Sequence, residues 1–320
     1  MRHTATTASA RDERPGAGMA PPAAAARSAS GTEGAPMTEP TVVVLLHGLG
    51  GNRHVWDDVA ELLSAQGTSV LAPDFRGHGR APWTGHYSFG AMAADIAQLL
   101  HRDYSGAPYA VVGHSMGGAV GLTLASGWFG PVPASVATIG VKLRWSGEEL
   151  GRLDDLASRP PREFPDRDGA VEWFMKLAGL HGVIDADDDR IEMAVEAGVM
   201  RTDTELHVTE DGEPMRIDPP GPAARWCVAQ DPATVEVGAP DMAGLLAAAK
   251  CPVVMALGEH DPLVVPAHHM DLASAAATNP HAAAVTAPHV FVGLGHNAMT
   301  ENPRAVADWL TTLPGFAGTR

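Results

Sequence analysis

Six short apolar runs, most of them rich in β-branched residues, are spread along the chain and end in glycine or polar residues. They are TVVVLLHG (41–48), SVLAPDFRG (69–77), YAVVGHS (109–115), ASVATIG (134–140), CPVVMALGEHDP (251–262) and HVFVGLGHNAM (289–299). Helical patterns follow several of them, over about 53–66, 88–103 and 116–126. Strands that alternate with helices form a parallel sheet with helices on both faces. The sequence therefore predicts an α/β fold with a doubly wound, mainly parallel sheet, whose sites form beyond the carboxyl ends of the strands.

Two segments depart from this alternation. Residues 1–40 are dominated by Ala, Pro, Gly, Ser and Thr without an apolar period, so we expect a disordered tail, with Met37 as a candidate for the true start. Residues 141–240 are rich in charge and are predicted to be several helices and loops without strands. The expected organisation is a tail (1–40), a core in two parts (41–140 and 241–320) and an inserted helical cap (141–240) over the carboxyl edge of the sheet.

The charge balance limits the partners of the chain. Its 320 residues include 22 Lys and Arg against 38 Asp and Glu, a formal net charge of −16 at pH 7. Such a chain repels phosphate backbones and anionic membrane surfaces, and no apolar run approaches the ~18 residues of a transmembrane helix. Two cysteines, Cys227 and Cys251, do not make a disulfide framework. We expect a cytoplasmic protein without a nucleic-acid or membrane partner. Whether it forms a homodimer is left open.

The segment GHSMGG places Ser115 in a Gly-x-Ser-x-Gly motif between a predicted strand and a predicted helix. A tight turn there puts the serine in a strained backbone conformation and exposes its hydroxyl. Neighbours two positions away lie against the adjacent strand and helix, so Gly113 and Gly117 meet a need for small residues. The N-terminus of the following helix favours negative charge at the serine. Ser115 is therefore the candidate nucleophile.

A nucleophilic serine needs a base and an acid that orients the base. His296 follows the last predicted strand as Gly-x-Gly-His, which places its imidazole on the same rim as Ser115. Asp261 follows the preceding strand, where a carboxylate can fix the tautomer of the histidine and stabilise the imidazolium. Glu259 is the local rival, and we prefer Asp261 because Gly-x-x-Asp-Pro is the usual form of this loop.

Backbone donors for an oxyanion are expected at two strand ends. His47-Gly48-Leu49-Gly50 ends the first strand, and its glycines let the N–H of Leu49 face the site beside the N–H of Met116. A metal site is a weaker interpretation of His260, Asp261, His268 and His269, because their spacing matches no common set of zinc ligands. His268 and His269 lie near a helix start and are expected to be solvated.

The order Ser115, Asp261, His296, preceded by the His-Gly loop, resembles the α/β-hydrolase superfamily over residues 41–140 and 241–312. PDFRGHGR (73–80) and Trp56 are further similar features. Members usually have two antiparallel strands before the strand that ends in His-Gly. Here only the tail precedes Thr41, so the expected sheet is reduced to the six parallel strands.

The resemblance implies a serine hydrolase without a cofactor or metal, which cleaves a carboxylic ester of a small molecule through an acyl-enzyme. Proteins with this fold also catalyse carbon–carbon bond hydrolysis, acyl transfer, aminopeptidase and perhydrolase reactions, and these activities stay open as alternatives. A ligand receptor with slow turnover is a further alternative. The cap should select the substrate. Lys142 and Trp145 follow the fourth strand and are candidates for substrate binding, although solvent-facing charge is the more ordinary role for Lys142.

Overall fold

The computed structural model describes residues 42–208, 214–222, 225–237, 241–276, 288–313 and 316. The predicted tail at 1–40 lies outside the described residues. Within the described part of the chain, no helix combines the length and the apolar character that crossing a bilayer requires.

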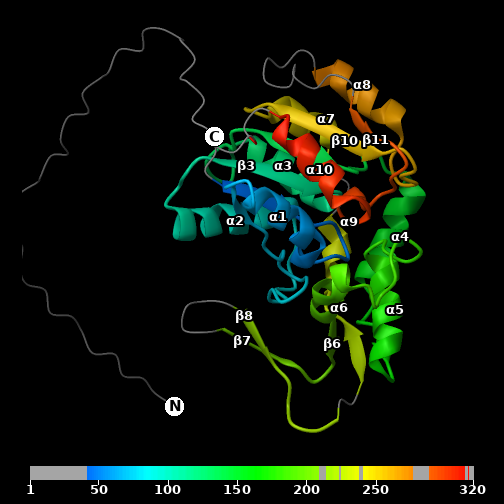
Figure 1. Cartoon of the computed structure of the whole chain (residues 1–320). Coiled ribbons are helices and arrows are strands. Elements are labelled where there is room, and N and C mark those ends of the chain that lie inside the picture. Colours follow the sequence, from blue (N-terminus) through cyan, green and yellow to red (C-terminus); the bar gives the residue numbers. More distant parts are fainter. Residues whose placement is uncertain are drawn as a thin grey trace, which may run out of the picture. The chain divides into compact units, whose positions relative to one another are not determined.

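A six-stranded sheet forms the centre of the fold, in the order β11-β10-β4-β3-β1-β2 (Figure 1). Its strands are β1 (Val42–Leu46), β2 (Ser69–Leu71), β3 (Tyr109–His114), β4 (Val136–Ile139), β10 (Val253–Gly258) and β11 (His289–Phe291). All five neighbouring pairs are parallel. This confirms the predicted parallel sheet, to which the described residues contribute six strands, with β2 and β11 at the edges.

Helices cover both faces of the sheet, as the alternation predicts. The helices of this part are α1 (Asp57–Ser64), α2 (Phe89–Tyr104), α3 (Met116–Ala125), α7 (Met242–Ala248), α8 (Pro266–Ala276), α9 (Ala298–Glu301) and α10 (Pro303–Thr311), with a 3₁₀ turn η1 (Arg53–Trp56) before α1. Alternate residues of β1 point to opposite faces of the sheet. Val42, Val44 and Leu46 pack in the cluster that includes α2, α3 and α7. Val43 and Leu45 belong instead to the cluster that includes α1 and α10.

The segment between β4 and α7 contains strands, so the expectation of helices and loops alone is wrong. It holds α4 (Gly147–Ala157), β5 (Glu163–Phe164), α5 (Arg167–Leu177), η2 (Asp189–Ile191), α6 (Glu192–Gly198), β6 (Val199–Arg201), β7 (Glu205–Val208), β8 (Pro214–Ile217), β9 (Trp226–Val228) and η3 (Pro232–Val237). β5, β9 and β6 form a small antiparallel sheet, and β7 pairs with β8. These strands have two to four residues, too few for an alternating pattern to be recognised in sequence.

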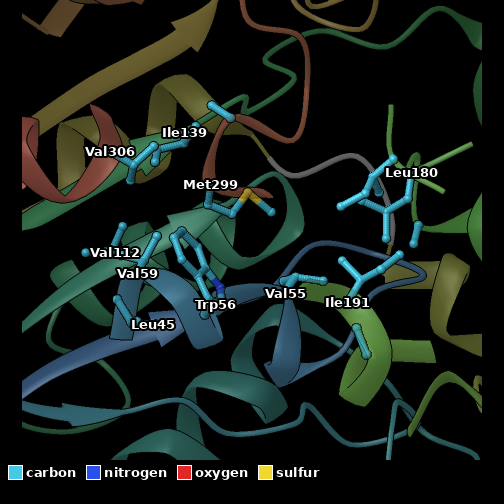
Figure 2. Close-up of a cluster of buried hydrophobic side chains, with 14 of the residues drawn as sticks. Leu45, Val55, Trp56, Val59, Val112, Ile139, Leu180, Ile191, Met299 and Val306 are labelled. Carbon is cyan, nitrogen blue, oxygen red and sulfur yellow. The ribbon is translucent and has the colours of Figure 1, made fainter. Parts of the chain in front are cut away.

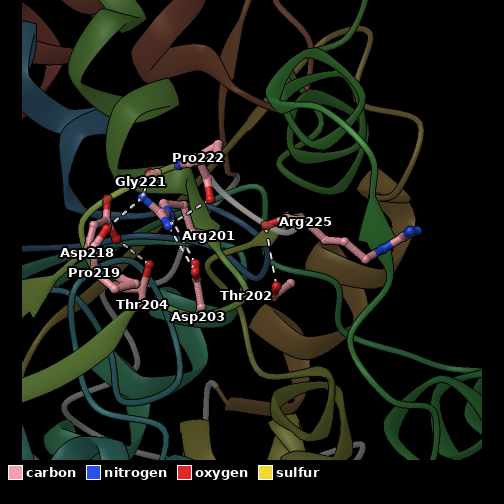
Figure 3. A network of polar contacts seen from close by, with 9 residues as sticks. All are labelled: Arg201, Thr202, Asp203, Thr204, Asp218, Pro219, Gly221, Pro222 and Arg225. Carbon is pink, nitrogen blue, oxygen red and sulfur yellow. Dashed lines mark hydrogen bonds and ion pairs between the residues drawn. The ribbon is translucent and has the colours of Figure 1, made fainter.

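Arg201, at the end of β6, holds together the loop that follows the β7–β8 hairpin (Figure 3). Its guanidinium forms two 2.9 Å hydrogen bonds to the Asp203 carboxylate. It also donates to the carbonyls of Pro219 and Gly221 at 3.0 and 2.9 Å. Because the guanidinium is nearly buried and has several rigidly spaced donors, one side chain satisfies carbonyls that are left without strand partners.

One apolar cluster joins this segment to the core. Figure 2 shows it running from the sheet through helix-borne side chains to the inserted segment, with Leu45, Val112, Trp56, Met299, Leu180 and Ile191 among its members. Asn52 strengthens the connection by donating to the carbonyl of Ala194 in α6 at 2.8 Å. The described residues form one compact unit, and the division at residues 141 and 240 stays a prediction.

Alanine at Gly117 is expected to destabilise the fold severely. A Cβ added there would lie 2.3 Å from the carbonyl oxygen of Leu46 and 2.6 Å from that of His47. Both are backbone atoms of the central sheet region, so no rotamer change relieves the overlap. Overpacking typically costs about 1–3 kcal/mol in the free energy of unfolding, and this position should lie at the upper end of that range, which urea unfolding of the Gly117→Ala variant would measure.

Gly151→Ala is the matched control, because a Cβ at this position in α4 meets nothing within 4 Å. It should stabilise the helix by roughly 0.5–1 kcal/mol. Equal unfolding midpoints for Gly117→Ala and the wild type would show that the turn after β3 is not packed as described.

Candidate active site

Ser115 lies at the turn between β3 and α3, with φ 50° and ψ −116°. Its N–H donates to the carbonyl of Ile139 at the end of β4 at 2.8 Å, which anchors the turn to the sheet. The side chain does not cap α3, although Ser115 stands at the N-cap position. The positive φ is the strained conformation that the motif predicts, and it leaves the hydroxyl available at the positive end of the helix dipole.

His296 and Asp261 are brought together although 35 positions separate them. The His296 ring lies with Nδ1 2.8 Å from Asp261 Oδ2, and the Asp261 side chain is fully buried. Asp261 Oδ1 accepts from the N–H of Leu263 at 2.9 Å, so both carboxylate oxygens have partners. An ionised carboxylate only accepts, so Nδ1 carries the proton and Nε2 keeps its lone pair. The rival Glu259 accepts from the N–H of Gly293 at 2.8 Å instead.

Residues that the sequence analysis did not single out hold the His296 loop. The Glu301 carboxylate accepts from the N–H of Gly295 at 2.7 Å, and buried His114 donates from Nε2 to the carbonyl of His296 at 3.0 Å. Asn297 donates to the carbonyl of Gly179, beyond α5, at 2.9 Å. Gly140, with φ 63°, lets its backbone lie against the pair, because a Cβ there would be 3.1 Å from both Asp261 Oδ2 and His296 Nδ1. In the sequence, the glycine directly after the fourth predicted strand was the one feature that could have indicated this close approach of the backbone to the Asp261–His296 pair.

The His47 side chain supports the glycine loop that follows β1. Its Nε2 accepts from the N–H of Phe75 at 3.0 Å, which places the proton on Nδ1, 2.8 Å from the carbonyl of Gly48. The imidazole thus ties the loop after β1 to the loop after β2. Gly50, with φ 77°, permits the close passage of the inserted segment, because a Cβ there would be 2.5 Å from the carbonyl oxygen of Leu177.

Leu49 and Met116 line the same cavity as Ser115 and His296. Among the described residues, neither the N–H of Leu49 nor that of Met116 has a hydrogen-bond acceptor. Unpaired backbone N–H groups that line a cavity are available to hydrogen-bond a ligand there.

This cavity has a volume of about 700 Å³. Much of its wall is apolar and comes from both the core and the inserted segment, through residues such as Phe89, Val141, Leu153, Leu177, Val183 and Leu263. Within the described residues, no hydrogen bond joins the Ser115 hydroxyl to His296, a contact that often tightens only when substrate binds. The volume suits a small organic ligand.

Lys142 and Trp145 also line the cavity, as the sequence analysis expected of substrate-binding residues. Lys142 is paired with Glu149 of α4, and Trp145 is half-buried against the core cluster that includes α3. A larger hollow of about 880 Å³ lies elsewhere, between the end of β2 and α2, and contains none of the predicted site residues. Its charged groups are largely paired with each other, as in the bidentate contact of Arg76 with Asp95.

No cluster of three or more His, Cys, Asp or Glu side chains that could hold a metal ion occurs in the described residues. His269, which the sequence analysis expected to be solvated, is fully buried, and neither of its ring nitrogens has a partner. The expectation failed because α8 turns this residue toward the core.

Acid is expected to unfold the protein between about pH 6.5 and pH 5. Burial lowers the pKa of His47, His114 and His269, and it lowers the pKa of His78 to about 3. The folded state therefore keeps these rings neutral, while the unfolded chain protonates them below about pH 6.5. Their contribution is present above that pH and is lost as the pH falls toward the folded-state pKa, by about 1.4 kcal/mol per histidine and pH unit.

Urea unfolding at pH 7.5, 6.5 and 5.5 would measure this loss. His78→Phe should reduce the slope by about one proton, since each histidine contributes at most one. A free energy of unfolding that stays constant from pH 7.5 to 5.5 would contradict the prediction.

Comparison with known proteins gives one family over most of the chain. Residues 43–309 match the sequence model of a group described as the alpha/beta hydrolase family. The lipase LipV of Mycobacterium tuberculosis is 38% identical over 87 residues, which span 27% of this chain and 32% of the lipase. Protein phosphatase methylesterase 1 of Bos taurus is 29% identical over 159 residues, 48% of this chain and 40% of the methylesterase. The matched stretches thus span less than half of these curated relatives.

Solved structures agree with the fold over a longer stretch. An esterase of Mycobacterium tuberculosis superimposes with a TM-score of 0.63 at 23% identity, covering 86% of this chain and 84% of the esterase. E-2-(acetamidomethylene)succinate hydrolase gives a TM-score of 0.61 at 23% identity, covering 86% and 91%. At this identity the likeness concerns the fold alone.

Proposed function

This chain belongs to the alpha/beta hydrolase family, and from that premise we propose that it is a serine hydrolase that cleaves a carboxylic ester of a small molecule. The observation that carries the proposal is the 2.8 Å contact of His296 Nδ1 with Asp261 Oδ2 at the cavity that Ser115 lines. This contact leaves His296 Nε2 free to act as a base, and both His296 and Ser115 line the same cavity. The esterases and lipases among the similar proteins support the choice of an ester bond.

In the first half of the reaction, Ser115 Oγ attacks the carbonyl carbon of the ester while His296 Nε2 takes its proton. The carbonyl oxygen becomes an oxyanion that accepts from the N–H groups of Leu49 and Met116. Asp261 stabilises the imidazolium through Nδ1–H. The bond to the leaving alkoxide then breaks, His296 donates the proton to it, and the acyl group stays on Ser115.

In the second half, a water molecule takes the place of the alcohol. His296 Nε2 removes a proton from the water as its oxygen attacks the acyl carbon, and the same N–H groups hold the second oxyanion. When the bond to Ser115 Oγ breaks, His296 returns the proton to Oγ and the carboxylic acid leaves. Each proton that His296 takes is thus given back within the same half-reaction.

The test combines a fluorophosphonate probe with a panel of 4-nitrophenyl esters of graded acyl length, an amide and a lactone. We expect labelling of the wild type at one serine and turnover of at least one ester. Labelling without turnover of any ester would reject ester hydrolysis and favour carbon–carbon cleavage or acyl transfer. A single stoichiometric burst of nitrophenol would favour a ligand receptor, and absence of both signals would reject the serine mechanism.

A further inference from the structure

The distribution of lysine in this chain is uneven. Of the 22 basic residues, 19 are arginines and three are lysines, at 142, 176 and 250. Lys142 and Lys176 both line the cavity that contains Ser115, and no arginine is among the described residues that line it. A lysine ammonium is a compact charge on a flexible stem, which can follow a ligand inside a cavity.

Acidic side chains are scarce on the same wall, although the chain as a whole carries a net charge of −16. Glu301 is the one acidic residue among the described residues that line the cavity, and its Oε2 accepts from the N–H of Gly295. The neutral part of the wall is largely apolar. The cavity therefore combines apolar surface with two lysines, and each lysine is paired with a glutamate that does not line the cavity, Lys142 with Glu149 and Lys176 with Glu172.

Lys142 is the more buried of the two lysines that line the cavity. It follows Gly140 by two positions, and the backbone of Gly140 lies against Asp261 and His296. Its side chain is 26% exposed, against 44% for Lys176. A carboxylate bound at Lys142 would therefore be screened less by solvent than one bound at Lys176.

Glu149, the ion-pair partner of Lys142, has other hydrogen-bond donors besides this lysine. Glu149 Oε1 contacts Lys142 Nζ, while Glu149 Oε2 accepts from the N–H of Ser146 at 2.8 Å in the capping box of α4. Lys142 first, and then the N–H of Ser146, lower the pKa of Glu149 to about 2. If Lys142 turns to another anion, the capping box still satisfies the Glu149 carboxylate.

We propose that the substrate is an ester that also carries an ionised carboxylate, and that Lys142 binds this carboxylate. The inference rests on the proposed function, since it names the substrate class of the same site. Lys176 is more exposed and is paired with Glu172 of its own helix, so we assign the carboxylate to Lys142. A Lys142–Glu149 pair that only ties α4 to the core would predict no preference between charged and neutral esters.

The test uses two esters of the same length, mono-4-nitrophenyl adipate and 4-nitrophenyl hexanoate. Wild-type protein should show a kcat/KM at least ~10-fold higher for the adipate, because a hydrogen bond to a charged group contributes a factor of roughly 10 to 100. Lys142→Met should reduce the adipate-to-hexanoate ratio by that factor, mainly through the KM for the adipate. Rising ionic strength should reduce the wild-type ratio in the same direction.

Two further variants keep the result interpretable. Lys250→Met removes the lysine outside the cavity and should leave the ratio unchanged. Glu149→Gln keeps a residue that suits the capping box and removes the competing charge, so it should raise the ratio several-fold.

An equal ratio in wild type and Lys142→Met would overturn the inference while hexanoate turnover left the proposed function standing. A ratio that falls equally in Lys250→Met would also overturn it, because the effect would not be local. Failure of wild-type protein to cleave either ester or to react with the fluorophosphonate would instead reject the proposed function.

Discussion

Replacing Ser115 with alanine is expected to lower kcat for esters by roughly 10⁴- to 10⁶-fold and to abolish fluorophosphonate labelling. The hydroxyl supplies the only bond between protein and acyl group in the proposed mechanism, so its removal leaves only binding and the oxyanion donors. The fold should survive, because the described Ser115 side chain does not cap α3 and alanine has no larger volume. Steady-state kinetics and mass spectrometry of the probe adduct measure the two effects.

Ser158→Ala is a suitable control, since Ser158 is an exposed serine at the end of α4. It should keep wild-type kinetics and labelling. Retention of either turnover or labelling in Ser115→Ala, with a thermal transition like that of the wild type, would show that another residue is the nucleophile.

The parallel sheet and the turn at Ser115 were predictable because their signals are local. A buried parallel strand requires a short apolar run, and β1 is such a run, buried at all five positions. The strand-to-helix turn requires glycine at fixed offsets from the serine. Gly113 shows why, because a Cβ there would lie 2.3 Å from the carbonyl oxygen of Gly117. Constraints of this kind act within a few residues and therefore leave a pattern in the sequence.

Contacts between the insertion and the site could not be predicted, because they join positions far apart in the chain. The end of α5 contacts both halves of the site: the carbonyl of Leu177 lies against Gly50, and the carbonyl of Gly179 accepts from Asn297. Backbone carbonyls carry no sequence signature. The segment that the sequence analysis assigned to substrate selection therefore also holds the loops that bear Leu49 and His296.

The roles of the histidines show the same limit. His47 and His296 each follow a strand, and each lies next to a glycine-rich loop. His47 is nevertheless buried, with both ring nitrogens hydrogen-bonded to backbone groups. His296 also lines the cavity, and of its ring nitrogens only Nδ1 has a hydrogen-bond partner among the described residues. The difference depends on which neighbour each ring meets, Phe75 or Asp261, and residue type alone does not specify that neighbour.

Asp261→Asn is expected to lower kcat by about 10⁴-fold with little change in stability. Asparagine is nearly isosteric, but its amide N–H can replace the Oδ2 that accepts from His296 Nδ1 at 2.8 Å. The ring would then accept at Nδ1 and carry its proton on Nε2, where it cannot take a proton from Ser115. The loss of the negative charge also removes the stabilisation of the imidazolium. Pre-steady-state release of nitrophenol would place the defect in acylation.

Glu259→Gln tests whether the effect belongs to Asp261 rather than to any carboxylate in this loop. Glu259 accepts from the N–H of Gly293 at 2.8 Å and lies exposed, so glutamine can keep that contact. We expect its kcat within about threefold of the wild type, because a surface carboxylate contributes little. If Glu259→Gln lost activity as fully as Asp261→Asn, the loop conformation would be the cause. If only Asp261→Asn lost activity, the cause would be the loss of the negative charge that faces His296 Nδ1.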